Sequence, residues 1–93
     1  MRAIYKYPLL LLQAAVSQSI VMPGGAEIRM VGLDPTGAPC IWAEVDPAPE
    51  SPEEKRTFWL YETGTPIAVA DGLKYVGSWV QEEFVWHLYE GLR

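Results

Sequence analysis

The chain has 93 residues, of which 49% are hydrophobic and 20% are charged. This length fits one domain, and the apolar content is that of a folded globule rather than a disordered chain. A single cysteine excludes an internal disulfide framework and indicates a reducing compartment. Twelve acidic against seven basic residues give a net charge of −5, which argues against duplex nucleic acid or an anionic membrane as the main partner.

The N-terminal segment contains an apolar run that partly matches a signal peptide. Arg2 and Lys6 precede the apolar residues 9–12, but Pro8 and Gln13 interrupt the pattern. The run is also much shorter than the roughly 18 residues that a transmembrane helix needs. We therefore expect neither a secretory signal nor a membrane span, and a cytoplasmic protein.

Short segments rich in Val, Ile, Trp, Tyr and Phe, separated by proline and glycine, predict strands along most of the chain. The expected strands cover residues 3–10, 19–22, 27–33, 39–45, 56–61, 73–80 and 83–89. Turn sequences separate several of them, at residues 23–25, 34–37 and 63–66. Helix candidates are confined to residues 10–16 and one turn near 68–73. We predict a single all-β domain, a small antiparallel β-sandwich or partly open barrel of about seven short strands.

Residues 46–55 form the most polar and proline-rich stretch, and their composition predicts an exposed loop. A second acidic segment is expected in the turn between the last two strands. We interpret these carboxylates as a candidate acidic surface for a partner, comprising Glu50, Glu53, Glu54, Glu82 and Glu83.

The alternation of side chains within the strands predicts which of them face the core. One consistent assignment places Ile28, Ile41, Phe58 and Phe84 inside. The opposite faces then carry Trp42, Trp59, Tyr61 and Tyr89, interleaved with Arg29 and His87. Exposed tryptophan and tyrosine beside cations are typical of binding hot spots, and so we also expect a homo-oligomer. Internal packing in a sandwich with both sheets covered is the alternative.

No catalytic signature stands out. His87 could form a catalytic triad with one of the serines and one of the acidic residues, but the chain has no G-x-S-x-G nucleophile elbow. Cys40 with His87 could form a nucleophile and base, whereas a free cysteine commonly packs as a small hydrophobic residue. One cysteine and one histidine also exclude a structural zinc site built from several such ligands. We expect a non-enzymatic protein with no metal and no cofactor.

The segment Thr63-Gly64-Thr65-Pro66 has two interpretations. A glycine between hydroxyl residues allows backbone amides and two hydroxyls to converge on an anion, as in phosphate-binding nests. The lysine and following helix of a P-loop are absent from the sequence, and glycine and proline are ordinary turn residues. Thr63, Gly64 and Thr65 are therefore candidate anion ligands, with a plain turn between strands as the alternative.

Several short motifs occur in a distinctive order along the chain, at residues 4–9, 22–28, 40–43, 45–46, 56–58, 63–67, 73–77 and 85–87. Their order resembles that of a family of small phage and prophage proteins of unknown function. The resemblance implies a phage or mobile-element origin, where small acidic proteins often counter host defences, and it transfers no catalytic residue.

Together these observations predict a phage accessory protein of the host cytoplasm that counters host defence by binding. In one mechanism it binds a host defence protein, and the acidic segments mimic the charge of nucleic acid. In another it sequesters a nucleotide second messenger, with Trp42 or Trp59 stacking on the base and Thr63-Gly64-Thr65 holding the phosphate. A virion or structural accessory role is a third possibility.

Overall fold

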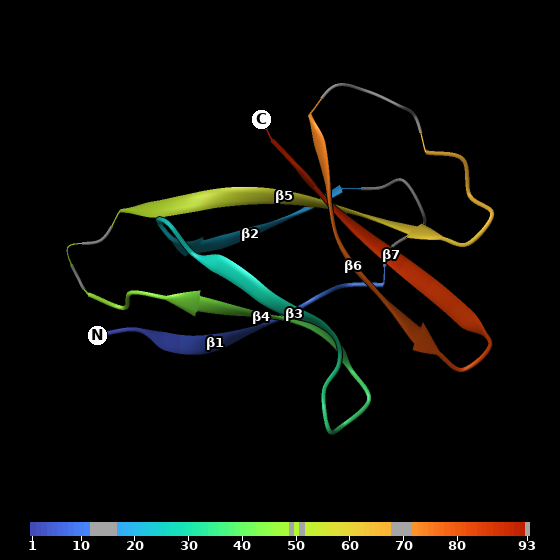
Figure 1. Cartoon of the computed structure of the whole chain (residues 1–93), viewed down its shortest axis with the longest axis horizontal. Coiled ribbons are helices and arrows are strands. Elements are labelled where there is room, and N and C mark those ends of the chain that lie inside the picture. Colours follow the sequence, from blue (N-terminus) through green and yellow to red (C-terminus); the bar gives the residue numbers. More distant parts are fainter. Residues whose placement is uncertain (12–16, 49, 51, 68–71, 93) are drawn as a thin grey trace.

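A computed structural model describes residues 1–11, 17–48, 50, 52–67 and 72–92 (Figure 1). These residues form seven antiparallel strands in two sheets and contain no helix. The strands are β1 (Ala3–Pro8), β2 (Ser17–Pro23), β3 (Glu27–Leu33), β4 (Pro39–Val45), β5 (Glu53–Glu62), β6 (Leu73–Gln81) and β7 (Phe84–Gly91). The prediction of an all-β antiparallel sandwich is confirmed.

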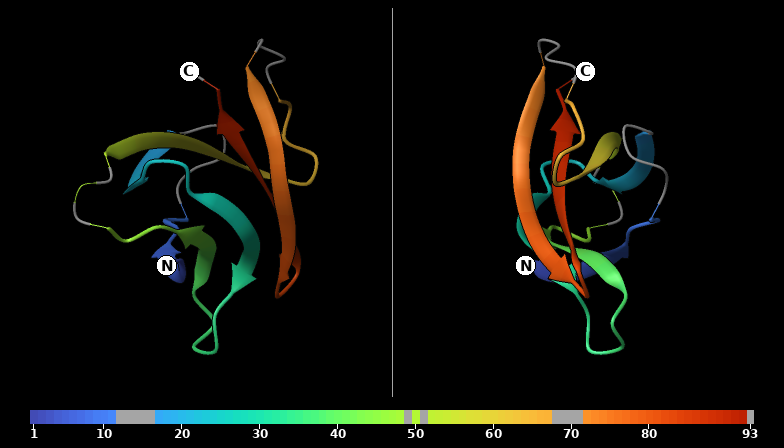
Figure 2. Two further views of the ribbon diagram at one scale, coloured as in Figure 1. Left: turned by 60° about the vertical axis from the view of Figure 1, so that its left-hand side comes forward. Right: turned by 90° about the vertical axis from the view of Figure 1, so that its right-hand side faces the viewer.

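The two sheets differ in size and strand order. The three-stranded sheet has the order β1-β4-β3, and the four-stranded sheet has the order β2-β5-β7-β6. The edge strand β3 of the first sheet packs against the edge strand β6 of the second, and Figure 2 shows the two layers from two further directions. The contact is close at Gly77, where a Cβ atom would lie 2.5 Å from Cγ1 of Val31.

The hydrophobic core lies between the sheets and follows the period-two alternation of the strands. From β4, Ile41, Ala43 and Val45 are fully buried, as the alternation predicts. Phe58 and Leu88 meet them from the four-stranded sheet and are also fully buried. Cys40 is buried too, and burial raises the pKa of its thiol, which agrees with its interpretation as a small packed residue.

Two expectations about the burial of aromatic side chains are wrong. Phe84 was expected in the core but is 40% exposed, because it opens β7 beside the exposed turn at Glu82 and Glu83. Tyr61 was expected on a wet face but is only 4% exposed. Its ring packs edge-on against Tyr89, with the ring centroids 5.7 Å apart.

Strand boundaries also differ from those predicted. β2 extends over Ser17–Pro23 and pairs with β5 along its whole length, from Ser17 opposite Trp59 to Pro23 opposite Glu53. This pairing draws Glu53, Glu54 and Lys55 into β5, so the last three residues of the expected loop 46–55 are strand residues. Most of the two helix candidates, residues 12–16 and 68–71, lie outside the described residues. No helix in the described part of the chain is long and apolar enough to span a membrane.

The turn between β3 and β4 is held by the Asp34 side chain. The amide of Gly37 donates to the carbonyl of Asp34 at 2.9 Å, as expected for a turn at residues 34–37. The Asp34 carboxylate accepts the hydroxyl of Thr36 at 2.6 Å and the amide of Ala38 at 3.0 Å. These two bonds and Lys6, whose ammonium lies 3.0 Å from the carboxylate, hold the pKa of Asp34 well below its usual range.

Candidate functional site

The outer face of the four-stranded sheet gathers most of the aromatic residues predicted for binding. The register places Trp59 opposite Tyr89 across β5 and β7, and Tyr75 opposite Tyr89 across β6 and β7. Tyr89 contacts Tyr75 edge-on, with the centroids 5.4 Å apart. We call this surface the aromatic face, and define it by Trp59, Tyr61, Thr63, Tyr75, Ser78, Val80, His87 and Tyr89.

A chain of hydrogen bonds crosses the aromatic face. Oη of Tyr75 lies 2.6 Å from Oγ of Ser78, which lies 2.7 Å from Nδ1 of His87. Nε2 of His87 lies 2.9 Å from Oγ1 of Thr63. Both ring nitrogens are therefore occupied, and the imidazole links β6 and β7 to the turn that follows β5.

The Ser78–His87 contact has the geometry of a nucleophile and base, but its surroundings differ from those of a catalytic triad. The third partner of the imidazole is the hydroxyl of Thr63, whereas triads use a carboxylate that stabilises the imidazolium. Ser78 and Thr63 are both exposed at the surface. The contacts hold Tyr75 and the turn in fixed positions relative to the sheet.

Tyr75 and Ser78 are functional candidates that sequence reasoning missed. Both precede His87 by about ten residues, and no local pattern links them to it. A bulge between Tyr75 and Gly77 shifts the register of β6, so that Ser78 rather than Gly77 lies opposite His87. Only the pairing of β6 with β7 brings these side chains together.

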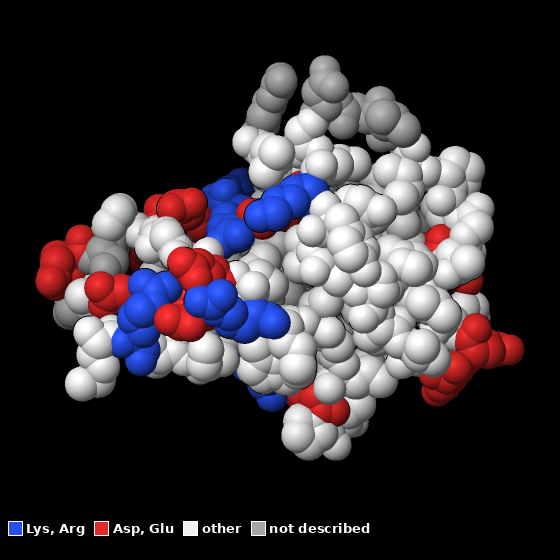
Figure 3. Space-filling view, in the orientation of Figure 1, with Lys and Arg blue, Asp and Glu red and all other residues white. Residues whose placement is uncertain are grey.

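The outward-facing side of this sheet contains few charges. Of its outward strand residues, only Glu53, the first residue of β5, is a carboxylate, and the rest are mostly hydroxyl, aromatic and aliphatic side chains. Tyr75 is 53% exposed and Val80 is 65% exposed. The space-filling view agrees, since the surface over β6 and β7 is mostly free of charged side chains (Figure 3).

The segment Thr63-Gly64-Thr65 forms a turn. The amide of Thr65 donates to the carbonyl of Glu62 at 2.9 Å, and the amide of Thr63 donates to the carbonyl of Val85 at 3.1 Å. Gly64 has a φ of 93°, which favours glycine. Two of the three amides that an anion-binding nest would use are thus engaged within the protein, and Thr63 instead contributes its hydroxyl to the aromatic face.

Arg29 and Trp42 lie on the other sheet. Trp42 of β4 is opposite Lys6 of β1 and Met30 of β3. Arg29 lies at the bulge in β3, where Nε donates to the carboxylate of Glu44 at 3.1 Å and Nη2 donates to that of Glu27. The structure therefore brings Trp59, Tyr61, Thr63 and His87 together on one sheet, and places Arg29 and Trp42 on the other.

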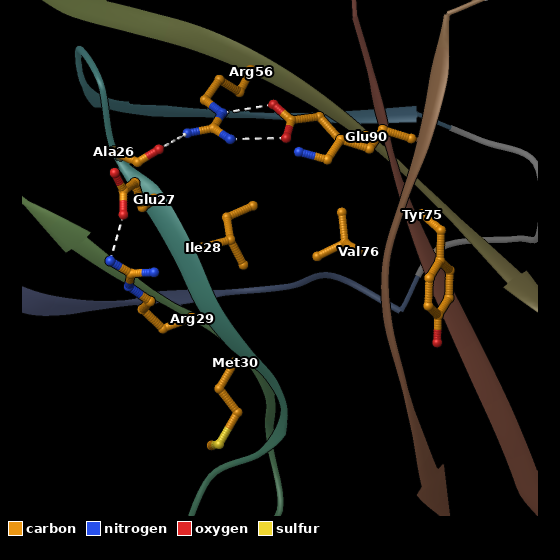
Figure 4. Close-up of a pocket in the computed structure, with 10 residues that line it drawn as sticks. Ala26, Glu27, Ile28, Arg29, Met30, Arg56, Tyr75, Val76 and Glu90 are labelled. Atoms are coloured by element: carbon orange, nitrogen blue, oxygen red, sulfur yellow. Dashed lines mark hydrogen bonds and ion pairs between the residues drawn. The ribbon is translucent and has the colours of Figure 1, made fainter.

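A groove runs between the edge strands β3 and β6 (Figure 4). Its first part has a volume of about 350 Å³ and is lined by residues 26–30 of β3, residues 74–76 of β6, Arg56 and Glu90. A second hollow of about 390 Å³ shares Ala26, Arg56, Lys74 and Glu90 with the first and extends to Lys55 and Gly91. We call the two hollows together the β3–β6 groove.

An ion pair between Arg56 and Glu90 lies where the two hollows of the groove meet. Nε and Nη2 of Arg56 donate to the two carboxylate oxygens of Glu90, at 2.6 and 2.8 Å. Nη1 donates to the carbonyl of Ala26 at 2.6 Å, and thereby joins the four-stranded sheet to the start of β3. The bonds to Glu90 raise the pKa of Arg56 above its ordinary value. Sequence reasoning missed this pair, because its members are 34 residues apart.

The predicted acidic residues occupy two separate places. Glu50, Glu53 and Glu54 are exposed where the chain passes from β4 into β5, whereas Glu82 and Glu83 are exposed at the turn between β6 and β7. The acidic side chains around these two places lie at opposite ends of the molecule in Figure 3. They do not form one continuous acidic surface.

Within the described ranges, no three His, Cys, Asp or Glu side chains are grouped as ligands for a metal. The fold and the surfaces described above define a two-sheet antiparallel β-sandwich with an aromatic outer face and a groove between its sheet edges. The chain belongs to a family described as a domain of unknown function, DUF7352, whose model matches residues 1–93. No curated protein and no solved structure matches it.

Proposed function

We propose that this chain is a non-enzymatic accessory protein of phage or prophage origin, which inhibits a host defence protein by binding it in the cytoplasm. The phage origin rests on the resemblance of its ordered motifs to small phage and prophage proteins. The binding mechanism rests on one observation above all, the aromatic face on the outer side of the four-stranded sheet. The face, rather than the acidic segments, supplies most of the binding energy.

The composition of the aromatic face supports a protein partner. Tyrosine and tryptophan are enriched in binding hot spots, and charged residues are depleted from the centres of protein interfaces. Here Trp59, Tyr75 and Tyr89 lie side by side on a sheet, with neighbouring hydroxyls available for hydrogen bonds. The hydrogen bonds through His87 hold part of the face in one arrangement before binding, which lowers the entropic cost of association.

The acidic residues support the same proposal in a different role. Glu53 begins β5 at one end of the face, and Glu82 and Glu83 lie in the turn at the end of β6. Exposed charges at the rim of an interface mainly raise the association rate with a partner of opposite charge. Mimicry of nucleic-acid charge at two separated ends therefore attracts a basic partner, while the aromatic face determines how long it stays bound.

The test compares two matched substitutions in cells that carry individual defence systems. Val80→Lys places a charge on the aromatic face, and Ile4→Lys places the same charge on the three-stranded sheet. Both wild-type side chains are aliphatic and more than half exposed, at 65% and 54%. We expect the wild type and Ile4→Lys to restore phage plaque formation in at least one defended strain, and Val80→Lys to lose this activity.

The purified defence protein from that strain then provides the direct measurement. Isothermal titration should give a dissociation constant that rises at least tenfold for Val80→Lys and stays within twofold for Ile4→Lys. Equal activity of both variants would contradict the placement of the binding surface. If no defended strain responds to the wild type and the protein is instead found in purified virions, the structural accessory role takes the place of this proposal.

A further inference from the structure

We infer that the β3–β6 groove is a binding site for a nucleoside phosphate. This inference goes beyond the proposed function, since it concerns a different surface and does not depend on a protein partner. It uses the cations and apolar side chains that line the groove, none of which belongs to the aromatic face except Tyr75 at the rim.

Positive charge gathers at the groove although the protein as a whole is acidic. Four of its seven basic residues line the two hollows, together with three carboxylates, so the lining carries a net charge of +1 in a chain of −5. The basic residues are Arg29, Lys55, Arg56 and Lys74, and the acidic ones are Glu27, Glu54 and Glu90. Such a local reversal of sign attracts an anion to this part of the surface.

The cations of the groove are not equally available to a ligand. Arg56 uses its donors on Glu90 and Ala26, and Arg29 uses its donors on Glu44 and Glu27. Lys55 and Lys74 are exposed, and neither is ion-paired with another described residue. Lys74 lines both hollows, so an anion bound where they meet lies within reach of its ammonium. The ammonium has three donors, a number suited to phosphate oxygens.

Ile28, Met30 and Val76 form an apolar patch within the groove, which suits an organic body attached to the phosphate. Ile28 of β3 and Val76 of β6 point toward each other across the gap in Figure 4, and the Arg29 and Tyr75 side chains point away from it. Met30 continues the lining along β3. The hollows of about 350 and 390 Å³ fall within the range of roughly 300–1,000 Å³ for small-molecule sites. A planar base between Ile28 and Val76 would direct its phosphate toward Lys74.

The experiment measures binding of adenosine monophosphate, adenosine and inorganic phosphate to the wild type and three variants. Lys74→Gln and Lys55→Gln each remove one of the cations that we assign to the phosphate. Lys6→Gln is the matched control, because it changes the net charge equally but lies on β1, away from the groove. Titration calorimetry gives the dissociation constants. The rise in Tm on adding ligand is measured for each variant relative to its own Tm without ligand.

We expect the wild type to bind the mononucleotide more tightly than adenosine or phosphate alone, and less tightly as salt is added. Loss of one charge-assisted hydrogen bond should weaken binding about tenfold, so Lys74→Gln should raise the Kd by that factor and Lys55→Gln by less. Lys6→Gln should change it less than twofold. Val80→Lys on the aromatic face should also leave it unchanged, which separates this site from the proposed protein interface.

Three results would overturn the inference. The first is that neither the mononucleotide nor cyclic dinucleotides, used as larger probes, bind at millimolar concentration. The second is equal weakening by Lys74→Gln and Lys6→Gln, which would indicate a general charge effect. The third is inorganic phosphate binding as tightly as the mononucleotide, since the apolar walls would then contribute nothing.

Discussion

Replacing Arg56 by methionine should strongly destabilise the fold, because Arg56 connects the two sheets. Methionine keeps much of the side-chain volume but removes the two bonds to Glu90 and the bond to the Ala26 carbonyl. The Arg56 and Glu90 side chains are only 18% and 12% exposed, so the remaining carboxylate has little access to water. Removing one partner of a buried ion pair costs about 3–5 kcal/mol, and we expect about 3 kcal/mol for this partly accessible pair.

The assay is urea and thermal unfolding followed by the fluorescence of the four tryptophans. In a domain of this size, about 3 kcal/mol lowers Tm by roughly 12–24 °C. The double variant Arg56→Met/Glu90→Leu should be at least about 1 kcal/mol more stable than Arg56→Met, because no charge is then left unpaired. Refutation would be a double variant whose loss of stability equals the sum of the two single losses, since the residues would then act independently.

Three further outcomes are expected. Gly77→Ala should lower the free energy of unfolding by about 1–3 kcal/mol through overpacking against Val31. The control Gly32→Ala should lower it less, because its Cβ would meet Trp79 at an ordinary 3.9 Å. Equal urea midpoints for the two variants would show that the β3–β6 contact is looser than described. The pKa of Asp34 is lower in the folded protein than in the unfolded chain, so the ionised Asp34 stabilises the fold above about pH 4 and this stabilisation is lost as the pH falls further. The urea midpoint of Asp34→Asn should therefore depend less on pH between about 5 and 2 than that of the wild type. Midpoints of the two proteins that change in parallel with pH would contradict this prediction. Self-association, which the sequence also predicts, would give a wild-type oligomer in sedimentation at micromolar concentration. A monomeric wild type would contradict it.

The sequence by itself determined the positions of the strands, apart from some of their ends, and much of the core. Short runs of β-branched and aromatic residues between proline and glycine predict strands, since this local preference does not depend on which strands later pair. Period-two alternation likewise places Ile41 and Phe58 inside, because successive side chains of a strand must point to opposite faces. The turn at residues 34–37 follows from the conformations that its own residues favour.

Only the tertiary structure decided which of these faces meet. Alternation assigns Trp42 and Trp59 each to one side of a strand, but strand pairing places them on different sheets and so divides the residues predicted to share a site. The chain of contacts from Tyr75 through His87 to Thr63 depends on a bulge in β6 and on the pairing of three segments. Arg56 and Glu90 meet because β5 and β7 are neighbours, although 34 residues separate them in the chain. Such arrangements depend on the pairing of strands that are far apart in the sequence. This pairing is set by the packing of the whole core, and no periodic pattern in the local sequence indicates it.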